Sequence, residues 1–262
     1  MTDFPHFECL GVDLADGVGT IVLNRPEKLN ALSAQLLEEL IAAAAWFDDR
    51  TDVRAVVIRG AGRAFTAGSD LSSAGEQGGS YSMREGLDLG RRMVDAVADM
   101  RPLTVAAIHG HCIGGGVVLA SACDIRIAAE DTRFSIPEVD LGMPLTWGGI
   151  PRLVRELGPS LTKDLVLTCR RFDGVEALRM GLVSRVTPAD GLESEAAAVA
   201  EKLASQPAYA LTTTKRHVDA VAEEAASTGQ TFREAELLFA ALQDEECQAA
   251  MVRSLSGRGG RG

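Results

Sequence analysis

Two glycine-rich segments are best suited by residue type and spacing to hold a reactive group. They are residues 64–71 (AFTAGSDL) and residues 108–116 (IHGHCIGGG), and each lies at the end of a predicted strand. Glycines let backbone N–H groups approach a ligand closely, and the unpaired N–H groups at a helix N-terminus carry partial positive charge. Two such groups that converge would stabilise a developing oxyanion. Tight turns required only for packing would explain the same glycines.

Other reactive side chains give weaker signals. His109 and His111 have the H-x-H spacing of a zinc-binding pair, but no third ligand is indicated, so no metal site is predicted. Ser69 lies outside any G-x-S-x-G pattern, which argues against a nucleophilic serine. Residues 160–163 fit S-x-x-K, yet neither S-D-N nor K-T-G is present. We therefore interpret Ser160 as the cap of a helix.

The elements around these segments alternate between strand and helix. Ser33 is a suitable N-cap for a helix through about Phe47, and from Pro159 onward the pattern is mostly helical, with breaks at Pro207 and Gly229. This alternation predicts an α/β fold with repeated strand–strand–helix units. Strands are predicted at residues 7–14, 18–24, 53–59, 103–109 and 124–128, and further helices over residues 82–100 and 117–122.

The same pattern of strands and helices divides the chain into two predicted regions and a tail. Residues 1–200 form a core of strands and helices, and residues 201–255 form a C-terminal helical region. The tail, residues 256–262 (SGRGGRG), has almost nothing to bury and is predicted to be disordered.

Composition narrows the class of protein. The chain has 262 residues, 46% of them hydrophobic, and a formal net charge of −11, so it is a poor general binder of nucleic acid or of anionic lipid surfaces. Its five cysteines are odd in number and form no C-x-x-C pair, which is typical of reduced thiols. Neither a signal peptide nor a membrane-spanning run is evident, so we expect a cytoplasmic protein.

Six motifs occur in a fixed order along the chain. They are residues 24–32 (NRPEKLNAL), 64–70 (AFTAGSD), 114–116 with Cys123-Asp124, 134–142 (FSIPEVDLG), 148–153 (GGIPRL) and 177–183 (ALRMGLV). Together they resemble the crotonase, or enoyl-CoA hydratase/isomerase, family over residues from about 7 to 250. That resemblance implies the crotonase fold, a spiral of ββα repeats with a C-terminal helical region that packs homotrimers, which often pair into hexamers.

The resemblance also implies a ligand, an acyl-CoA thioester, whose coenzyme A is part of the substrate. It implies no metal and no redox cofactor. The backbone N–H groups of Ser69 and Gly115 match the family's oxyanion hole, which holds the thioester oxygen as it becomes an enolate. Matching CoA- or substrate-binding positions are Arg25, Lys28, Ala67, Asp70, Leu71, His111 and Gly114. A partly buried, hydrogen-bonded histidine is the alternative for His111, and Arg63 is a further candidate for phosphate contact.

Acidic residues decide which reaction the resemblance implies. Hydratases of the family use two glutamates, and here the second matches Glu138 whereas the first falls at Val118. A third acidic position, used by some dienoyl-CoA isomerases and aryl-CoA dehalogenases, falls at Thr146. One carboxylate suffices to carry a proton from C2 to C4 of a 3-enoyl-CoA, so we expect an isomerase with Glu138 as its catalytic residue. Without the resemblance, Glu138 would be read as a solvated carboxylate.

Three alternatives remain at this stage. A hydratase could use Asp140, which would share a face with Glu138 if the segment is extended, or a pocket histidine as its second group; an Asp140–arginine ion pair is the simpler reading. A non-catalytic acyl-CoA binding protein would keep the oxyanion hole and lack turnover. A serine peptidase of the same spiral fold is disfavoured because no nucleophile motif is present. The acyl chain, the pathway and the choice between trimer and hexamer are not predicted.

Overall fold

The N-terminal hairpin forms as predicted. In a computed structural model that describes residues 6–71, 83–229 and 231–258, β1 (Leu10–Ala15) pairs antiparallel with β2 (Val18–Leu23). The two residues between them, Asp16 and Gly17, both have positive φ angles, 50° and 78°. A two-residue turn with positive φ at both positions matches the right-handed twist of the strands that it joins.

The hairpin begins a six-stranded sheet with the order β1-β2-β3-β4-β6-β8, in which every pair after the first is parallel. Its other strands are β3 (Ala55–Gly60), β4 (Leu103–Ile108), β6 (Ile125–Ala129) and β8 (Arg185–Thr187). All six residues of β4 are buried. A continuous apolar strand of this kind is typical of a parallel sheet covered on both faces.

A second, two-stranded sheet produces the predicted ββα repeats. It pairs β5 (His111–Ile113) with β7 (Arg133–Ser135) in parallel. In each repeat the first strand joins the large sheet, the second joins the small sheet, and a helix follows: β4, β5 and α3 (Gly115–Ala122), then β6, β7 and α4 (Gly149–Thr168). The spiral of ββα repeats is therefore confirmed.

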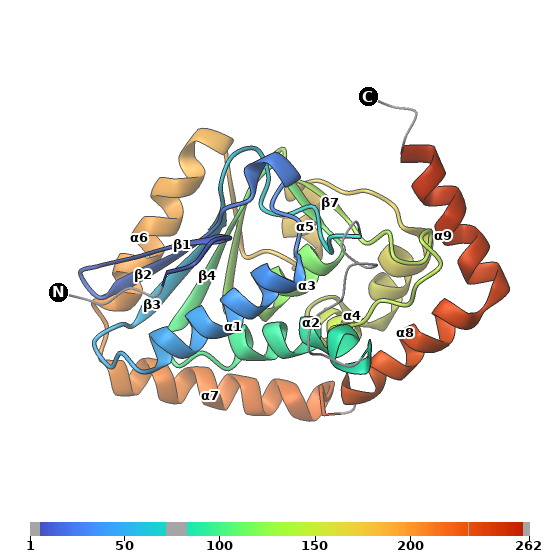
Figure 1. Cartoon of the computed structure of the whole chain (residues 1–262). Coiled ribbons are helices and arrows are strands. Elements are labelled where there is room, and N and C mark those ends of the chain that lie inside the picture. The colour runs from blue at the N-terminus through green and yellow to red at the C-terminus, as the bar shows by residue number, and fades with distance from the viewer. Residues whose placement is uncertain (1–5, 72–82, 230, 259–262) are drawn as a thin grey trace.

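Helices cover both faces of the large sheet (Figure 1). On one side lie α1 (Ala34–Asp48) and α2 (Met83–Ala98), which pack extensively against each other. Ser33 caps α1, since its hydroxyl accepts a hydrogen bond from the Leu36 N–H group, as predicted. On the other side α6 (Leu192–Ala204) packs against β3, β4 and β6. The domain boundary predicted at residue 200 thus falls inside a helix that packs on the sheet.

The C-terminal region is helical, as expected. After α5 (Gly174–Met180) and α6, the chain forms α7 (Ala208–Ala225), α8 (Glu234–Gln243) and α9 (Glu245–Arg258). Helix α7 runs along one edge of the molecule, while α8 and α9 lie at the end away from α6 (Figure 1). Residues 256–258 of the predicted tail are helical here, and residues 259–262 lie outside the described residues. No helix in the described part of the chain is long and apolar enough to cross a membrane.

One local prediction is wrong, and a condition on which one alternative depended is not met. Ser160 does not begin a helix: α4 begins at Gly149, and Gly158, with φ of 75°, interrupts it directly before Pro159. Because proline favours the first helical position, Ser160 lies inside the second stretch rather than at its cap. The segment with Glu138 and Asp140 is not extended either, since residues 138–142 form a turn. The two side chains therefore do not share a strand face.

Asn30 ties the first glycine-rich segment to the rest of the sheet. Its side chain is fully buried, and its amide donates hydrogen bonds to the carbonyl oxygens of Ala61 and Ala64 at 2.9 and 2.8 Å. Its own Oδ1 accepts from the Arg25 N–H group at 2.9 Å. The backbone φ of Asn30 is 54°, a left-handed conformation that asparagine tolerates better than most residues.

We expect Asn30→Ala to lower the free energy of unfolding by about 2–4 kcal/mol, because it leaves buried donors and acceptors unpaired and places alanine at a positive φ. Chemical denaturation measures the change. Asn24→Ala, at an exposed position on the same segment, is the matched control and is expected to change stability by less than about 0.5 kcal/mol. Equal effects of the two substitutions would contradict this role for Asn30.

Candidate active site

The two glycine-rich segments meet through backbone pairing. The Thr66 N–H group donates to the His111 carbonyl at 2.9 Å, and the Ile113 N–H group donates to the Thr66 carbonyl at 3.2 Å. Gly68, with φ of 85°, approaches so closely that an added Cβ would lie 2.5 Å from the Ile113 oxygen and 3.6 Å from the Gly115 nitrogen. Only glycine fits this contact, which places the 68–69 peptide against the N-terminus of α3.

This approach leaves two backbone donors without partners. Leu32 binds both sides of Ser69, since its N–H donates to the Gly68 carbonyl and its carbonyl accepts from the Asp70 N–H. The N–H groups of Ser69 and Gly115 make no hydrogen bond with any described residue. Gly115 is the first residue of α3, where N–H groups have no intrahelical acceptor and the helix dipole is positive. The geometry can therefore bind an oxygen that gains negative charge.

Glu138 lies directly beside these donors. A Cβ added to Gly114, the residue before α3, would be 2.4 Å from Glu138 Oε1, so the missing side chain makes room for the carboxylate. The other oxygen, Oε2, is buried and has no hydrogen-bond partner among the described residues. Desolvation raises the pKa of Glu138 to about 7, and a hydrogen bond with its own backbone N–H opposes the shift. A carboxyl group with this pKa can both accept and release a proton near neutral pH.

A cavity of about 70 Å³ connects the donors with the carboxylate. Val118 and Thr146, the two positions where the family resemblance expects further acids, both line it, so Glu138 is the one ionisable side chain that the described residues contribute to the cavity. Its walls are Ser69, Leu71, Gly115, Val118, Glu138, Met143, Pro144, Leu145, Thr146, Trp147 and Leu238. The sequence analysis did not identify Trp147 or Leu238, because no sequence signal shows which apolar side chains converge on a cavity.

The predicted CoA-binding residues lie at the edge of this arrangement. Arg25 Nη1 donates to the Ala31 carbonyl at 2.6 Å and to Asp70 Oδ2 at 3.0 Å. This ion pair joins the second residue after β2 to the loop that contains Ser69. Lys28 is exposed on a short 3₁₀ helix, and Ala67 is half-buried with its N–H bonded to the Leu29 carbonyl.

His111 and Asp140 are placed away from the cavity. His111 pairs with Arg133 across the small sheet; burial, and then the charges of Arg133, Arg63 and Arg171, lower its pKa. Asp140 is exposed and takes part in none of the ion pairs formed by the described residues. Its charge adds to burial in raising the pKa of Cys169. Neither residue is among those that line the cavity with Glu138.

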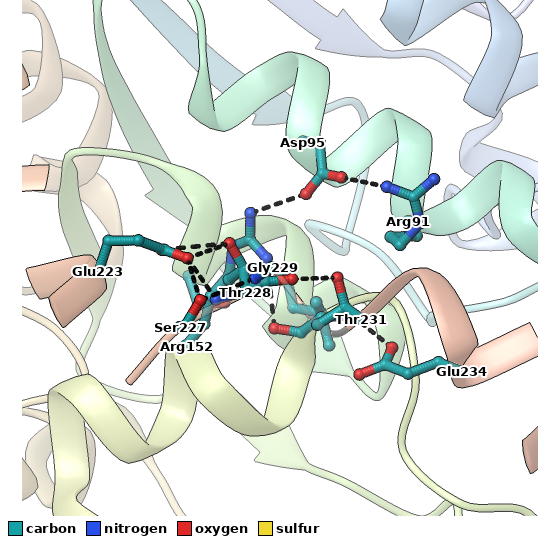
Figure 2. Close-up of polar contacts among 12 residues, drawn as sticks. Arg91, Asp95, Arg152, Glu223, Ser227, Thr228, Gly229, Thr231 and Glu234 are labelled. Carbon is teal, nitrogen blue, oxygen red and sulfur yellow. Dashed lines mark hydrogen bonds and ion pairs between the residues drawn. The ribbon is translucent and has the colours of Figure 1, made fainter. Parts of the chain in front are cut away.

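A buried polar network holds the loop before α4. The Gly148 N–H group donates to Glu234 Oε2 of α8 at 2.7 Å, and Arg152 donates to the Gly148 carbonyl at 3.3 Å. Figure 2 shows Asp95 of α2 between the guanidinium groups of Arg91 and Arg152. The network therefore links α2, α4 and α8 around the loop that contributes Thr146 and Trp147 to the cavity.

Comparisons with known proteins agree with this geometry. The family model described as enoyl-CoA hydratase/isomerase matches residues 13–256. A Mycobacterium tuberculosis protein named a probable enoyl-CoA hydratase is 36% identical over 96% of both chains. The peroxisomal Δ(3,5)-Δ(2,4)-dienoyl-CoA isomerase of Arabidopsis thaliana is 36% identical over 82% of both chains. The crystal structure of an enoyl-CoA hydratase/isomerase from Pseudoalteromonas atlantica superimposes with a TM-score of 0.87 at 28% identity, covering 95% of this chain and 98% of that one.

The burial of Glu138 predicts that removing its charge stabilises the fold at alkaline pH. The pKa is about 7 in the folded chain and 4.5 for the free side chain, so stability falls as pH rises through this window. Glu138→Gln removes this cost, and we expect it to raise the free energy of unfolding by roughly 3 kcal/mol at pH 8 and by much less at pH 4.5. Denaturation at both pH values measures the gain, with Glu201→Gln on the exposed side of α6 as the control. A loss of stability at pH 8 would contradict the burial argument.

Proposed function

The chain belongs to the enoyl-CoA hydratase/isomerase family, and we propose that it isomerises an enoyl-CoA thioester with Glu138 as its single acid–base group. The observation that carries this proposal is the content of the cavity, where Glu138 is the one ionisable side chain among the described residues and Val118 and Thr146 occupy the two positions at which the family resemblance expects further acids. A reaction that moves one proton needs one such group. Hydration needs a second group to activate or orient water.

The thioester oxygen would accept hydrogen bonds from the N–H groups of Ser69 and Gly115. Both donors are held by backbone pairing before substrate arrives, so they need no reorganisation as negative charge develops on the oxygen. Each donor of this kind contributes about 2.7–4 kcal/mol to the stability of a transition state. The positive end of α3 acts in the same direction.

Glu138 would then carry the proton. Its carboxylate removes a proton from C2 of a 3-enoyl-CoA, and the electron pair moves into a dienolate whose oxygen is held by the two N–H groups. The protonated Glu138 returns the same proton to C4, the double bond shifts to C2–C3, and the carboxylate is regenerated. Protonation of a carboxylate relieves its desolvation, which is consistent with a pKa of about 7 for a group that must release the proton again.

Binding of the coenzyme A portion is assigned to the rim of the site. The basic candidates are Lys28, Arg25 and Arg63, because phosphates prefer charged donors and the chain as a whole is acidic. Ala67, Asp70, Leu71 and Gly114 would border the pantetheine and thioester. His111 lies among Arg63, Arg133 and Arg171, so a phosphate-side contact suits it better than contact with the acyl group.

We also propose that the C-terminal helices form a homotrimer or a dimer of trimers. Large apolar side chains on them are exposed in the single chain, which suits an interface with a second copy. They are Tyr209, Val218 and Val221 on α7, Leu237 and Phe239 on α8, and Val252 on α9.

Hydration is the second candidate, because most of the similar proteins are named hydratases. The hydroxyl of Thr146 is on the cavity wall and could both donate to and accept from a water there, whereas the indole N–H of Trp147 could only donate. Asp140, the substitute suggested by the sequence, is exposed and outside that wall. A Thr146→Val substitution should therefore abolish any hydratase activity while leaving proton transfer between carbons in place.

We expect Glu138→Gln to lower kcat for isomerisation of a 3-enoyl-CoA, assayed at several chain lengths from 3-butenoyl-CoA upward, by at least about 10²-fold, the usual contribution of a general base. The absorbance of the conjugated 2-enoyl thioester measures the rate, and the mass of the product separates isomerisation from hydration. Asp140→Asn is the matched control and should retain wild-type activity. Unchanged turnover by Glu138→Gln would contradict the assignment, and binding of acyl-CoA without product by the wild type would favour a binding protein.

The pH profile gives an independent test of the same residue. The base is active as a carboxylate, so kcat/KM should rise with pH through an apparent pKa of about 7 in the free enzyme. A rise of kcat/KM centred near pH 4.5 instead would mean that the catalytic carboxyl group is not desolvated. Steady-state rates from pH 5 to pH 9, at substrate concentrations well below KM, measure the profile.

A further inference from the structure

Trp147 has a backbone conformation that its residue type disfavours. Its φ is 63°, in the left-handed region that costs an L-residue with a large side chain free energy. Such residues persist only where their surroundings fix them, and they concentrate at functional sites. Trp147 lies between Thr146 and Gly148, in the loop that reaches the cavity with Glu138.

Two glycines make room for the indole ring. A Cβ added to Gly90, in the interior of α2, would lie 1.9 Å from Trp147 Cε2, and a Cβ added to Gly115 would lie 2.4 Å from Trp147 Cζ3. Glycine inside a helix is unfavourable relative to alanine, so the space at Gly90 is gained at a cost in helix stability. The indole therefore fills the gap between α2 and Gly115, the first residue of α3.

The loop that contains Trp147 is fixed on its C-terminal side. Gly148 donates its N–H to the half-buried carboxylate of Glu234, and its carbonyl accepts from Arg152. Arg152 is in turn bound to Asp95 of the same helix that contains Gly90. A ring held in this way is a rigid wall, and it does not swing aside at low cost.

From this packing we infer that Trp147 is the end wall of the acyl pocket and restricts the enzyme to short acyl chains such as butenoyl. This inference rests on the proposed function, because it assumes that the cavity beside Glu138 receives the acyl group. The chain would start at the thioester between Ser69 and Gly115, pass Glu138, and meet the face of the indole beside Gly115. Further methylene groups would have to enter the space that the ring occupies against Gly90.

Equilibrium binding of saturated acyl-CoAs tests the inference without turnover. Butyryl-, hexanoyl-, octanoyl- and decanoyl-CoA would be titrated into the wild type, Trp147→Gly and Trp147→Phe by calorimetry. Glycine accepts the positive φ, so Trp147→Gly removes the ring without adding backbone strain. We expect the wild type to bind butyryl-CoA more tightly than octanoyl-CoA and Trp147→Gly to reverse that order, with octanoyl affinity raised about tenfold or more. Trp147→Phe should fall between them.

Gly90→Ala is a second variant that acts from the opposite side. Its Cβ would push the indole towards the cavity, so binding of butyryl-CoA should weaken while binding of free coenzyme A stays the same. Trp46→Phe, which changes the other of the two tryptophans, is the control and should match the wild type throughout.

The outcomes separate this inference from the proposed function. If all acyl-CoAs bind but the order of chain lengths is the same in wild type and Trp147→Gly, Trp147 is not the end wall, whereas the acyl-CoA function stands. If no acyl-CoA binds to folded wild type, the proposed function itself fails. Should Trp147→Gly unfold, an unchanged order in Trp147→Phe and Gly90→Ala would still overturn the inference.

Discussion

The close approach of the 68–69 peptide to the N-terminus of α3 is the constraint on which the rest of the site depends. It requires a residue without Cβ at Gly68, and it pairs the segment with β5 and Leu32, while the N–H groups of Ser69 and Gly115 have no partner in the part of the chain that the structure describes. Sheet and helix must both be in place for this contact, because one donor comes after β3 and the other comes after β5. The ββα repeat therefore serves the chemistry by placing two loop ends at one point.

The environment of Glu138 beside this contact both lowers the stability of the fold and suits the carboxyl group to proton transfer. Buried carboxylates normally receive hydrogen bonds, yet Oε2 of Glu138 has none among the described residues. Gly114 leaves space for the group, and the apolar side chains of Val118 and Leu145 line the cavity beside it. The pKa of Glu138 is therefore raised to about 7, and ionising the buried group lowers the stability of the fold. A glutamate with a purely structural role would not need this cost. That cost supports the catalytic interpretation more directly than the position of Glu138 in a motif.

Much of the fold and part of the site could be predicted from residue types. The Asp16-Gly17 turn, the Ser33 cap and the apolar run of β4 are local signals, and each was confirmed. The family resemblance supplied Ser69, Gly115 and Glu138, which the structure brings to one cavity. Ser160 was misplaced because the left-handed Gly158 and Pro159 set the helix start, and Asp140 does not share a face with Glu138 because its segment forms a turn. In both cases the decisive information is backbone conformation, which residue spacing alone does not encode.

The residues that could not be predicted from the sequence were missed for a different reason. Trp147 and Leu238 are ordinary apolar residues in the sequence, and Glu234 is one of many acids. Their roles arise from contacts between α2, α4 and α8, which lie far apart in the chain. Gly90 illustrates the point: in isolation it is an unfavourable residue inside a helix, and its value appears only when the indole of Trp147 is seen against it. Gly90 breaks a local rule, and a residue far away in the chain compensates for it. Such a pair cannot be recognised from the sequence, because neither residue indicates its role without the other.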